Sequence, residues 1–78
     1  LHKPENDFQQ QIHDACASAL GHADFSIDED LYSAGLDSFG SIMLIADFTE
    51  KLHRNITLAE LMEHRTVKEL ETFFNEQD

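Results

Sequence analysis

Ser38 is the residue of this sequence whose neighbours along the chain best suit a chemical role. It stands where a helix is predicted to begin, directly after Asp37 and shortly after Gly35. The first amides of a helix lack intrahelical acceptors and form the positive end of its dipole, so they suit a phosphate held on or near this hydroxyl. A serine at a helix start is more often only a cap or a first helical residue. On physical grounds alone, both interpretations stay open.

The other chemistry-bearing residues do not form a recognisable site. Acidic residues alternate from Asp24 to Asp30 as in a calcium loop, but Glu29 and Gly35 occupy the positions where that loop needs glycine and glutamate. The five histidines include no i, i+4 pair, so we expect most of them at the surface and no metal site. Cys16 lies on an apolar stripe and is expected to be a small buried residue. No nucleophile, base and orienting group converge, so we expect no catalytic residues.

Size and charge limit the classes of function. The chain has 78 residues, and we expect residues 1–78 to form a single domain with a core of about 8–74. Its formal net charge of -11 argues against nucleic acid as a partner. No apolar run is long enough for membrane insertion, and one cysteine cannot form an internal disulfide, so we expect a cytoplasmic monomer. Whether the natural chain is free-standing or part of a longer protein is left open.

Apolar spacing and capping signals predict the helices. Apolar residues recur at helical spacing from Phe8 to Ala19, and Gly21 is expected to end this first helix. Capping-box patterns at Thr57 and Thr66 predict a third helix of one or two turns and a last helix with an apolar face. With the helix that starts at Ser38, these elements predict an all-α fold. It is a small four-helix bundle of three main helices and one short helix.

The first connection, residues 22–37, is long and acidic and contains no Lys or Arg. Its apolar side chains are expected to tie it to the core, and ordered loops of this length are more often functional than idle. The first ten residues and the tail after residue 74 are expected to be frayed.

The predicted helix from about Ser38 to His53 is apolar on two sides when residues are placed about 100° apart. One stripe suffices for the core of a small bundle, so the second either packs beneath the long loop or is exposed as a docking surface for other proteins. One stripe consists of Leu44, Ile45, Phe48 and Leu52, and the other of Phe39, Ile42, Met43 and Ala46.

A resemblance to a known family rests on residues 35–39 (GLDSF) together with 41–44 (SIML). This segment resembles the attachment site of the carrier proteins, namely acyl carrier proteins and the peptidyl carrier or thiolation domains of nonribosomal peptide synthesis. Residues 30–35 resemble the approach to that site. Residues 57–70 resemble the third and fourth helices as they are found in peptidyl carriers. The resemblance covers about residues 8–74.

This resemblance implies that Ser38 accepts 4′-phosphopantetheine covalently from coenzyme A, in a reaction performed by a separate magnesium-dependent phosphopantetheinyl transferase. The thiol of the arm then holds an acyl or aminoacyl group as a thioester, and the chain itself is a non-catalytic carrier. Asp37 matches the residue before the family's serine and is expected to contribute to transferase recognition or to the magnesium environment, besides capping the helix. Further implied partners are a loading enzyme (an adenylation enzyme or ligase) and a downstream acyl-using enzyme. The expected partner-binding residues are Leu36, Phe39, Ile42, Met43 and Ala46.

The cargo is less well defined by the resemblance. Phe39 is also found in carriers of D-alanine, and Arg65 stands where peptidyl carriers often have proline. We favour an aminoacyl or peptidyl carrier of a nonribosomal-peptide-like pathway over a fatty-acid, polyketide or D-alanyl carrier. The alternative from another class is a helical interaction module without a prosthetic group, in which Ser38 is only a helix-start residue.

Overall fold

Each helix begins after an N-cap residue, and those of the last three helices are the predicted ones. The N-cap side chain accepts a hydrogen bond from the amide three residues on, which satisfies one of the free donors at a helix start. Thr57 and Glu60 form a complete capping box, whereas at Thr66 the described residues show only the bond from the Glu69 amide to the threonine hydroxyl. The four N-caps are Asn6, Asp37, Thr57 and Thr66.

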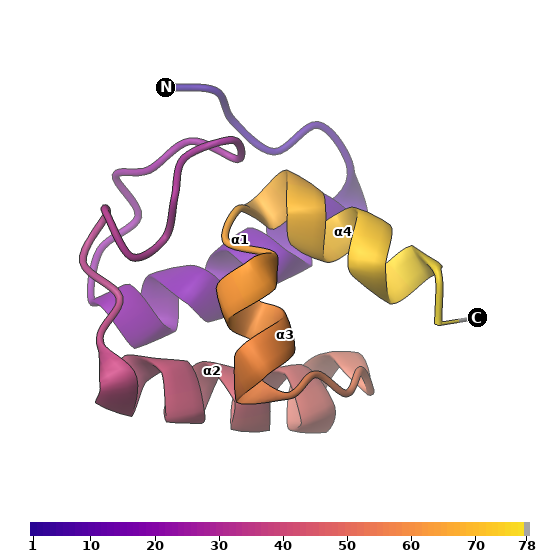
Figure 1. Cartoon of the computed structure of the whole chain (residues 1–78). Coiled ribbons are helices and arrows are strands. Elements are labelled where there is room, and N and C mark those ends of the chain that lie inside the picture. Colours follow the sequence, from indigo (N-terminus) through magenta and orange to yellow (C-terminus); the bar gives the residue numbers. More distant parts are fainter. Residues whose placement is uncertain (78) are drawn as a thin grey trace.

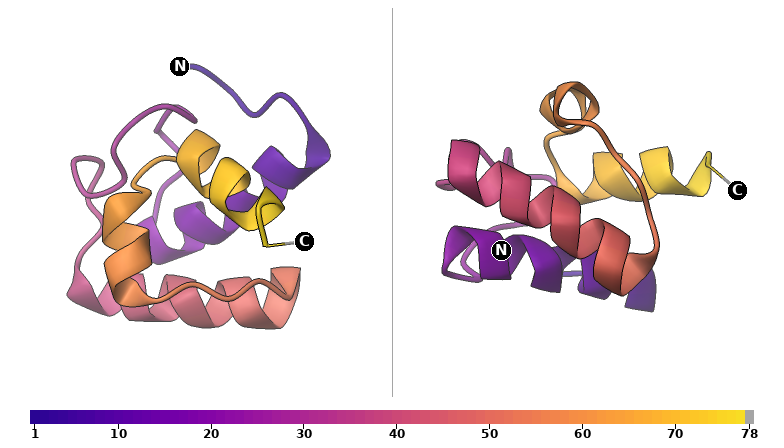
Figure 2. Two further views of the ribbon diagram at one scale, coloured as in Figure 1. Left: turned by 45° about the vertical axis from the view of Figure 1, so that its right-hand side comes forward. Right: turned by 90° about the horizontal axis from the view of Figure 1, so that it is seen from below.

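The computed structural model describes residues 1–77, and the predicted all-α bundle with one short helix is confirmed. Helices α1 and α2 lie side by side and run in opposite directions, and α3 stands across them and leads into α4, which packs over α1 (Figure 1, Figure 2). None of these helices has the length and apolarity needed to cross a membrane. The helices span Asp7–Leu20 (α1), Ser38–Leu52 (α2), Leu58–Glu63 (α3) and Val67–Asn75 (α4).

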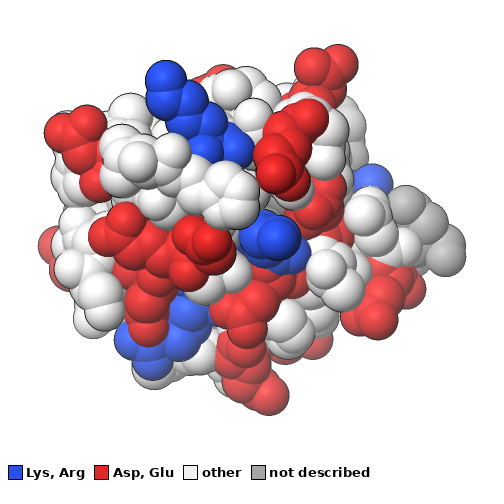
Figure 3. Space-filling view, turned by 90° about the horizontal axis from the view of Figure 1, so that it is seen from above, with Lys and Arg blue, Asp and Glu red and all other residues white. Residues whose placement is uncertain are grey.

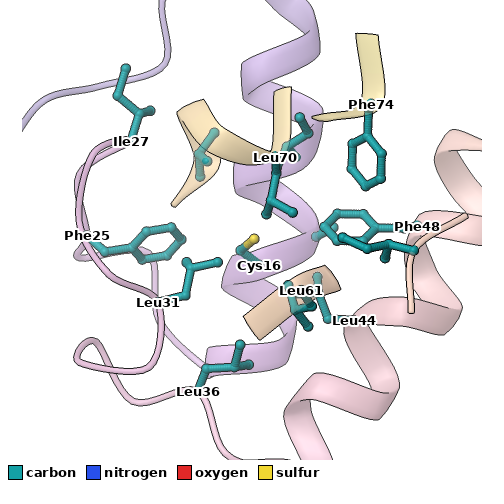
Figure 4. Close-up of a cluster of buried hydrophobic side chains, with 14 residues drawn as sticks. Cys16, Phe25, Ile27, Leu31, Leu36, Leu44, Phe48, Leu61, Leu70 and Phe74 are labelled. Atoms are coloured by element: carbon teal, nitrogen blue, oxygen red, sulfur yellow. The ribbon is translucent and has the colours of Figure 1, made fainter. Parts of the chain in front are cut away.

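The core receives side chains from all four helices and from the long loop. Cys16 of α1 lies in the middle of this cluster and is fully buried, as expected, and burial raises the pKa of its thiol (Figure 4). Phe48 of α2 and Phe74 of α4 meet edge to face with ring centroids 5.0 Å apart. His13 departs from the expected surface position of most histidines, because its ring is buried and stacks on Phe25 at 4.1 Å.

The loop between α1 and α2 is ordered, as predicted. Phe25, Ile27 and Leu31 are all buried, and Phe25 and Leu31 point toward the middle of the core (Figure 4). The backbone of Ile27 also joins two distant segments, because its amide donates to the carbonyl of His2 at 2.9 Å and its carbonyl accepts from the amide of Lys68 at 3.0 Å. The prediction of a frayed N-terminal segment is therefore wrong for the residues around His2. Residue 78 of the predicted frayed tail lies outside the described residues.

Truncation of Phe48 tests this core. We expect Phe48→Ala to lower the free energy of unfolding by about 3–5 kcal/mol, because it removes a fully buried ring and leaves a cavity. Urea denaturation followed by circular dichroism measures this loss. Phe39→Ala is the matched control, since Phe39 is on the same helix but 74% exposed, and we expect a change within about 0.5 kcal/mol. Phe48→Leu, which keeps more of the volume, serves if the alanine variant does not fold. Equal stabilities for the Phe48 and Phe39 variants would contradict the assignment of Phe48 to the core.

Candidate functional site

A tight turn brings the chain into α2. The turn is closed by backbone hydrogen bonds from Gly35 to Tyr32 at 3.2 Å and from Leu36 to Leu31 at 3.0 Å. Gly35 has a φ of 122°, a conformation that side-chain-bearing residues rarely adopt, so a glycine is needed at this point. The next residues, Asp37 and Ser38, are exposed, and Ser38 is the first residue of α2.

Asp37 caps this helix, as predicted. Its carboxylate accepts from the amide of Gly40 at 2.7 Å, and its carbonyl accepts from the amide of Ser41 at 2.8 Å. The amides of Ser38 and Phe39 come before the first intrahelical hydrogen bond and have no acceptor within the helix. Two free donors and the positive end of the dipole thus lie beside the exposed Ser38 hydroxyl. This donor set fits a phosphodiester on Ser38.

Gly40 lets the first turn of α2 approach the end of α1 closely. A Cβ at this position would lie 3.1 Å from the carbonyl oxygen of Ala19 and 3.1 Å from Cδ1 of Leu36. Glycine inside a helix costs about 0.5–1 kcal/mol relative to alanine, and here it permits a contact that a larger residue would obstruct. The turn that carries Ser38 is therefore seated directly against the backbone of α1.

The connection between α3 and α4 holds the same turn from its other side. Arg65 forms an ion pair with Asp30, with Nε and Oδ2 3.1 Å apart, and its carbonyl accepts from the amide of Leu31 at 2.8 Å. Partial burial acts to raise the pKa of Asp30, but the amides of Ser33 and Tyr32 and the charged Arg65 outweigh it and lower that pKa. Asp30 is thus kept ionised as an acceptor for the turn.

The second apolar stripe of α2 is exposed and does not pack beneath the loop. The exposed fractions are 74% for Phe39, 58% for Ile42 and 45% for Met43, and Ala46 is also exposed. The prediction of Leu36 as a partner-binding residue is corrected, because this side chain is buried beside Gly40 and faces the core (Figure 4).

Two exposed apolar residues on α3 were not predicted from the sequence. Leu58 is 43% exposed and Met62 is 51% exposed, while Leu61 between them is fully buried. Their i, i+4 spacing would have placed both on one side of the short helix. We call the five exposed residues on the two helices the α2–α3 apolar residues. They are Phe39, Ile42, Met43, Leu58 and Met62.

Acidic side chains dominate the face seen from above in Figure 1, with a few Lys and Arg side chains between them (Figure 3). No group of His, Cys, Asp and Glu within residues 1–77 is arranged to hold a metal ion.

Comparisons with known proteins identify the family of this chain. A sequence model of the family described as "Phosphopantetheine attachment site" matches residues 10–74. The chain is 34% identical over 67 residues to N-(5-amino-5-carboxypentanoyl)-L-cysteinyl-D-valine synthase of Penicillium rubens, covering 86% of this chain but 2% of the synthase. It is 35% identical over 74 residues to the nonribosomal peptide synthetase ucdA of Aspergillus ustus, covering 88% of this chain and 8% of that protein.

Solved structures show the same fold. One matching chain belongs to the structure of the phosphopantetheine transferase Sfp in complex with coenzyme A and a peptidyl carrier protein. It has a TM-score of 0.89 and 16% identity, and the match covers 97% of this chain and 99% of that chain. A second belongs to the solution structure of a docking domain complex of the Pax NRPS (PaxA T1-CDD/PaxB NDD). Its TM-score is 0.86 at 17% identity, and the match covers 96% of this chain and 72% of that chain.

The family match includes the turn, the Asp37 cap and the exposed Ser38, and it confirms the family inferred from residues 35–44. This chain therefore belongs to the phosphopantetheine attachment site family, the carrier domains whose cofactor is a covalently bound 4′-phosphopantetheine.

Proposed function

We propose that this chain is a peptidyl or aminoacyl carrier domain of nonribosomal peptide synthesis, and that Ser38 is its attachment residue. The observation that carries the proposal is the exposed Ser38 at the start of α2, within the region matched by the family. The peptide synthases among its relatives support this type of pathway. Residues 1–78 act as one carrier unit in this proposal.

Attachment requires a nucleophile that a second enzyme can reach. The Ser38 oxygen forms a bond to the phosphorus of coenzyme A that carries the pantetheine arm, and the bond from that phosphorus to the adenosine half breaks. Adenosine bisphosphate leaves, and the hydroxyl proton passes to a base of the transferase. The free amides of Ser38 and Phe39 lie where they can hold the resulting phosphodiester. When bound, the cofactor supplies a thiol that holds the acyl or aminoacyl group as an activated thioester.

The chain itself then needs to present the arm and to be recognised, so we propose that it is not catalytic. Its partners would be a phosphopantetheinyl transferase, a loading enzyme of the adenylation or ligase class, and a downstream acyl-using enzyme. The net charge of -11 favours basic surfaces on these partners. The α2–α3 apolar residues, together with Ala46, would supply the apolar contacts. The buried free thiol of Cys16 fits a reducing cytoplasmic location.

The attachment residue is tested with Ser38→Ala. We expect intact-protein mass spectrometry to show one phosphopantetheine addition on the parent and none on the variant, after incubation with coenzyme A, magnesium and a broad-specificity transferase. Ser33→Ala is the control, because Ser33 is another exposed serine in the adjoining turn and should leave the modification unchanged. Phosphopantetheine addition to the Ser38→Ala variant would contradict Ser38 as the attachment residue. A folded parent that accepts no arm would favour the interaction module, for which the α2–α3 apolar residues are the specific observation.

The two roles of Asp37 are separable by substitution. Asn caps helices about as well as Asp, so Asp37→Asn should leave stability nearly unchanged, while Asp37→Ala should cost about 1 kcal/mol. If the carboxylate charge contributes to transferase recognition, both variants should lower kcat/KM for modification by roughly tenfold or more, the loss of one contact to a charged group. Modification kinetics measure the effect on transferase recognition, and urea denaturation measures the effect on stability. A parental rate for Asp37→Asn would show that Asp37 acts as a cap alone.

Docking on α2 is tested with Phe39→Ala and Met43→Ala. We expect each variant to lower kcat/KM for modification or loading by roughly fivefold or more, because exposed apolar anchors contribute most to such contacts. Helical content should not change, since both side chains are exposed. Leu1→Ala is the control, because Leu1 is 77% exposed but lies away from α2 and α3. Rates equal to that control would remove these residues from the docking surface.

A further inference from the structure

A buried serine links the first turn of α2 to the preceding loop. Ser41 is 1% exposed, and its hydroxyl donates to the carbonyl of Asp37 at 2.8 Å. The same oxygen lies 3.0 Å from the hydroxyl oxygen of Tyr32. Because a serine hydroxyl has one hydrogen, and Ser41 uses it on Asp37, the Tyr32 hydroxyl is the donor in this second bond.

Tyr32 is in turn held by its surroundings. Its backbone amide donates to Oδ1 of Asp30 at 2.8 Å, and the guanidinium of Arg65 lies over its ring, 4.6 Å from the ring centre. Arg65 is fixed by its ion pair with the same Asp30 carboxylate. A continuous set of contacts thus runs from the α3–α4 connection through Tyr32 and Ser41 to the carbonyl of Asp37, the residue before Ser38.

We propose that Tyr32 is a positioning residue for the attachment reaction. Its hydroxyl orders the Ser41–Asp37 pair and thereby fixes the direction in which the Ser38 hydroxyl is presented. This inference rests on the proposed attachment at Ser38. The first turn of a helix frays because its amides lack intrahelical partners, and one net hydrogen bond favours the ordered turn by roughly two- to tenfold. Small displacements of a nucleophile lower the rate of a bimolecular transfer strongly, so this ordering affects the chemical step.

The kinetic test compares the parent with Tyr32→Phe, Ser41→Ala and the double variant. Tyr32→Phe removes only the hydroxyl, and we expect it to lower kcat for modification by roughly two- to tenfold. KM for the chain should not change, since this hydroxyl points toward buried Ser41 and not toward the α2–α3 apolar residues. The double variant should be no slower than Ser41→Ala, because both substitutions interrupt one path. Thr72→Ala is the matched control, since Thr72 makes the same kind of bond, to the carbonyl of Lys68 on α4, and should leave kcat unchanged.

Hydrogen exchange separates positioning from general loss of stability. We expect the amides of Gly40 and Ser41 to exchange faster in Tyr32→Phe, while that of Leu70 on α4 keeps its parental rate. If the parent is modified and the Tyr32→Phe variant keeps the parental kcat, the positioning role of Tyr32 is wrong, while the proposed function still holds. A slower variant in which all helices exchange faster also overturns it, because the loss is then one of global stability. A folded parent that no transferase modifies overturns the proposed function itself, and with it the role of Tyr32 in attachment.

Discussion

The first turn of α2, which carries Ser38, is held by three sets of contacts. Gly40 brings the turn against the Ala19 carbonyl of α1, and Asp37 satisfies the amide of Gly40 from within the turn. From the loop side, the Tyr32 hydroxyl donates to Ser41, whose own hydroxyl donates to the carbonyl of Asp37. Ser38 is exposed beside these fixed neighbours. Its hydroxyl is thus carried at the start of a helix whose first turn is held in place by other side chains.

The two apolar stripes of α2 differ in their roles, because one is buried in the core and the other is open to other molecules. Leu44 and Phe48 are fully buried and hold the helix to the core, whereas Phe39 and Ile42 are left largely exposed. Exposed apolar groups on a small domain add nothing to its stability and favour association with other molecules. The net charge of -11 opposes indiscriminate association of like copies, because such copies repel one another. Under the proposed function, this combination suits brief contacts with basic surfaces of the partners.

Much of this architecture follows from the sequence through local physical chemistry. N-caps such as Asp37 and Thr57 and the C-terminal Gly21 act over three or four residues, so they predicted the helix limits without knowledge of the fold. The two stripes of α2 follow from its helical period. The segment 35–39 indicated the family, which the family match confirms, and it marked Ser38 as the candidate attachment residue.

Contacts between distant segments were decided only by the tertiary structure. Periodicity could not show which stripe of α2 would be exposed, because that depends on where the loop packs. Leu36 is adjacent to the exposed Asp37 in sequence but turns into the core, and the backbone carbonyl of His2 accepts from the amide of the buried Ile27. Likewise, the contact of Arg65 with Tyr32 joins residues that no local spacing relates. The sequence by itself determined the helices and their caps and marked Ser38 as the candidate serine, since these depend on neighbours along the chain. The contacts that hold the turn of Ser38 join side chains that folding brings together, so only the tertiary structure decided them.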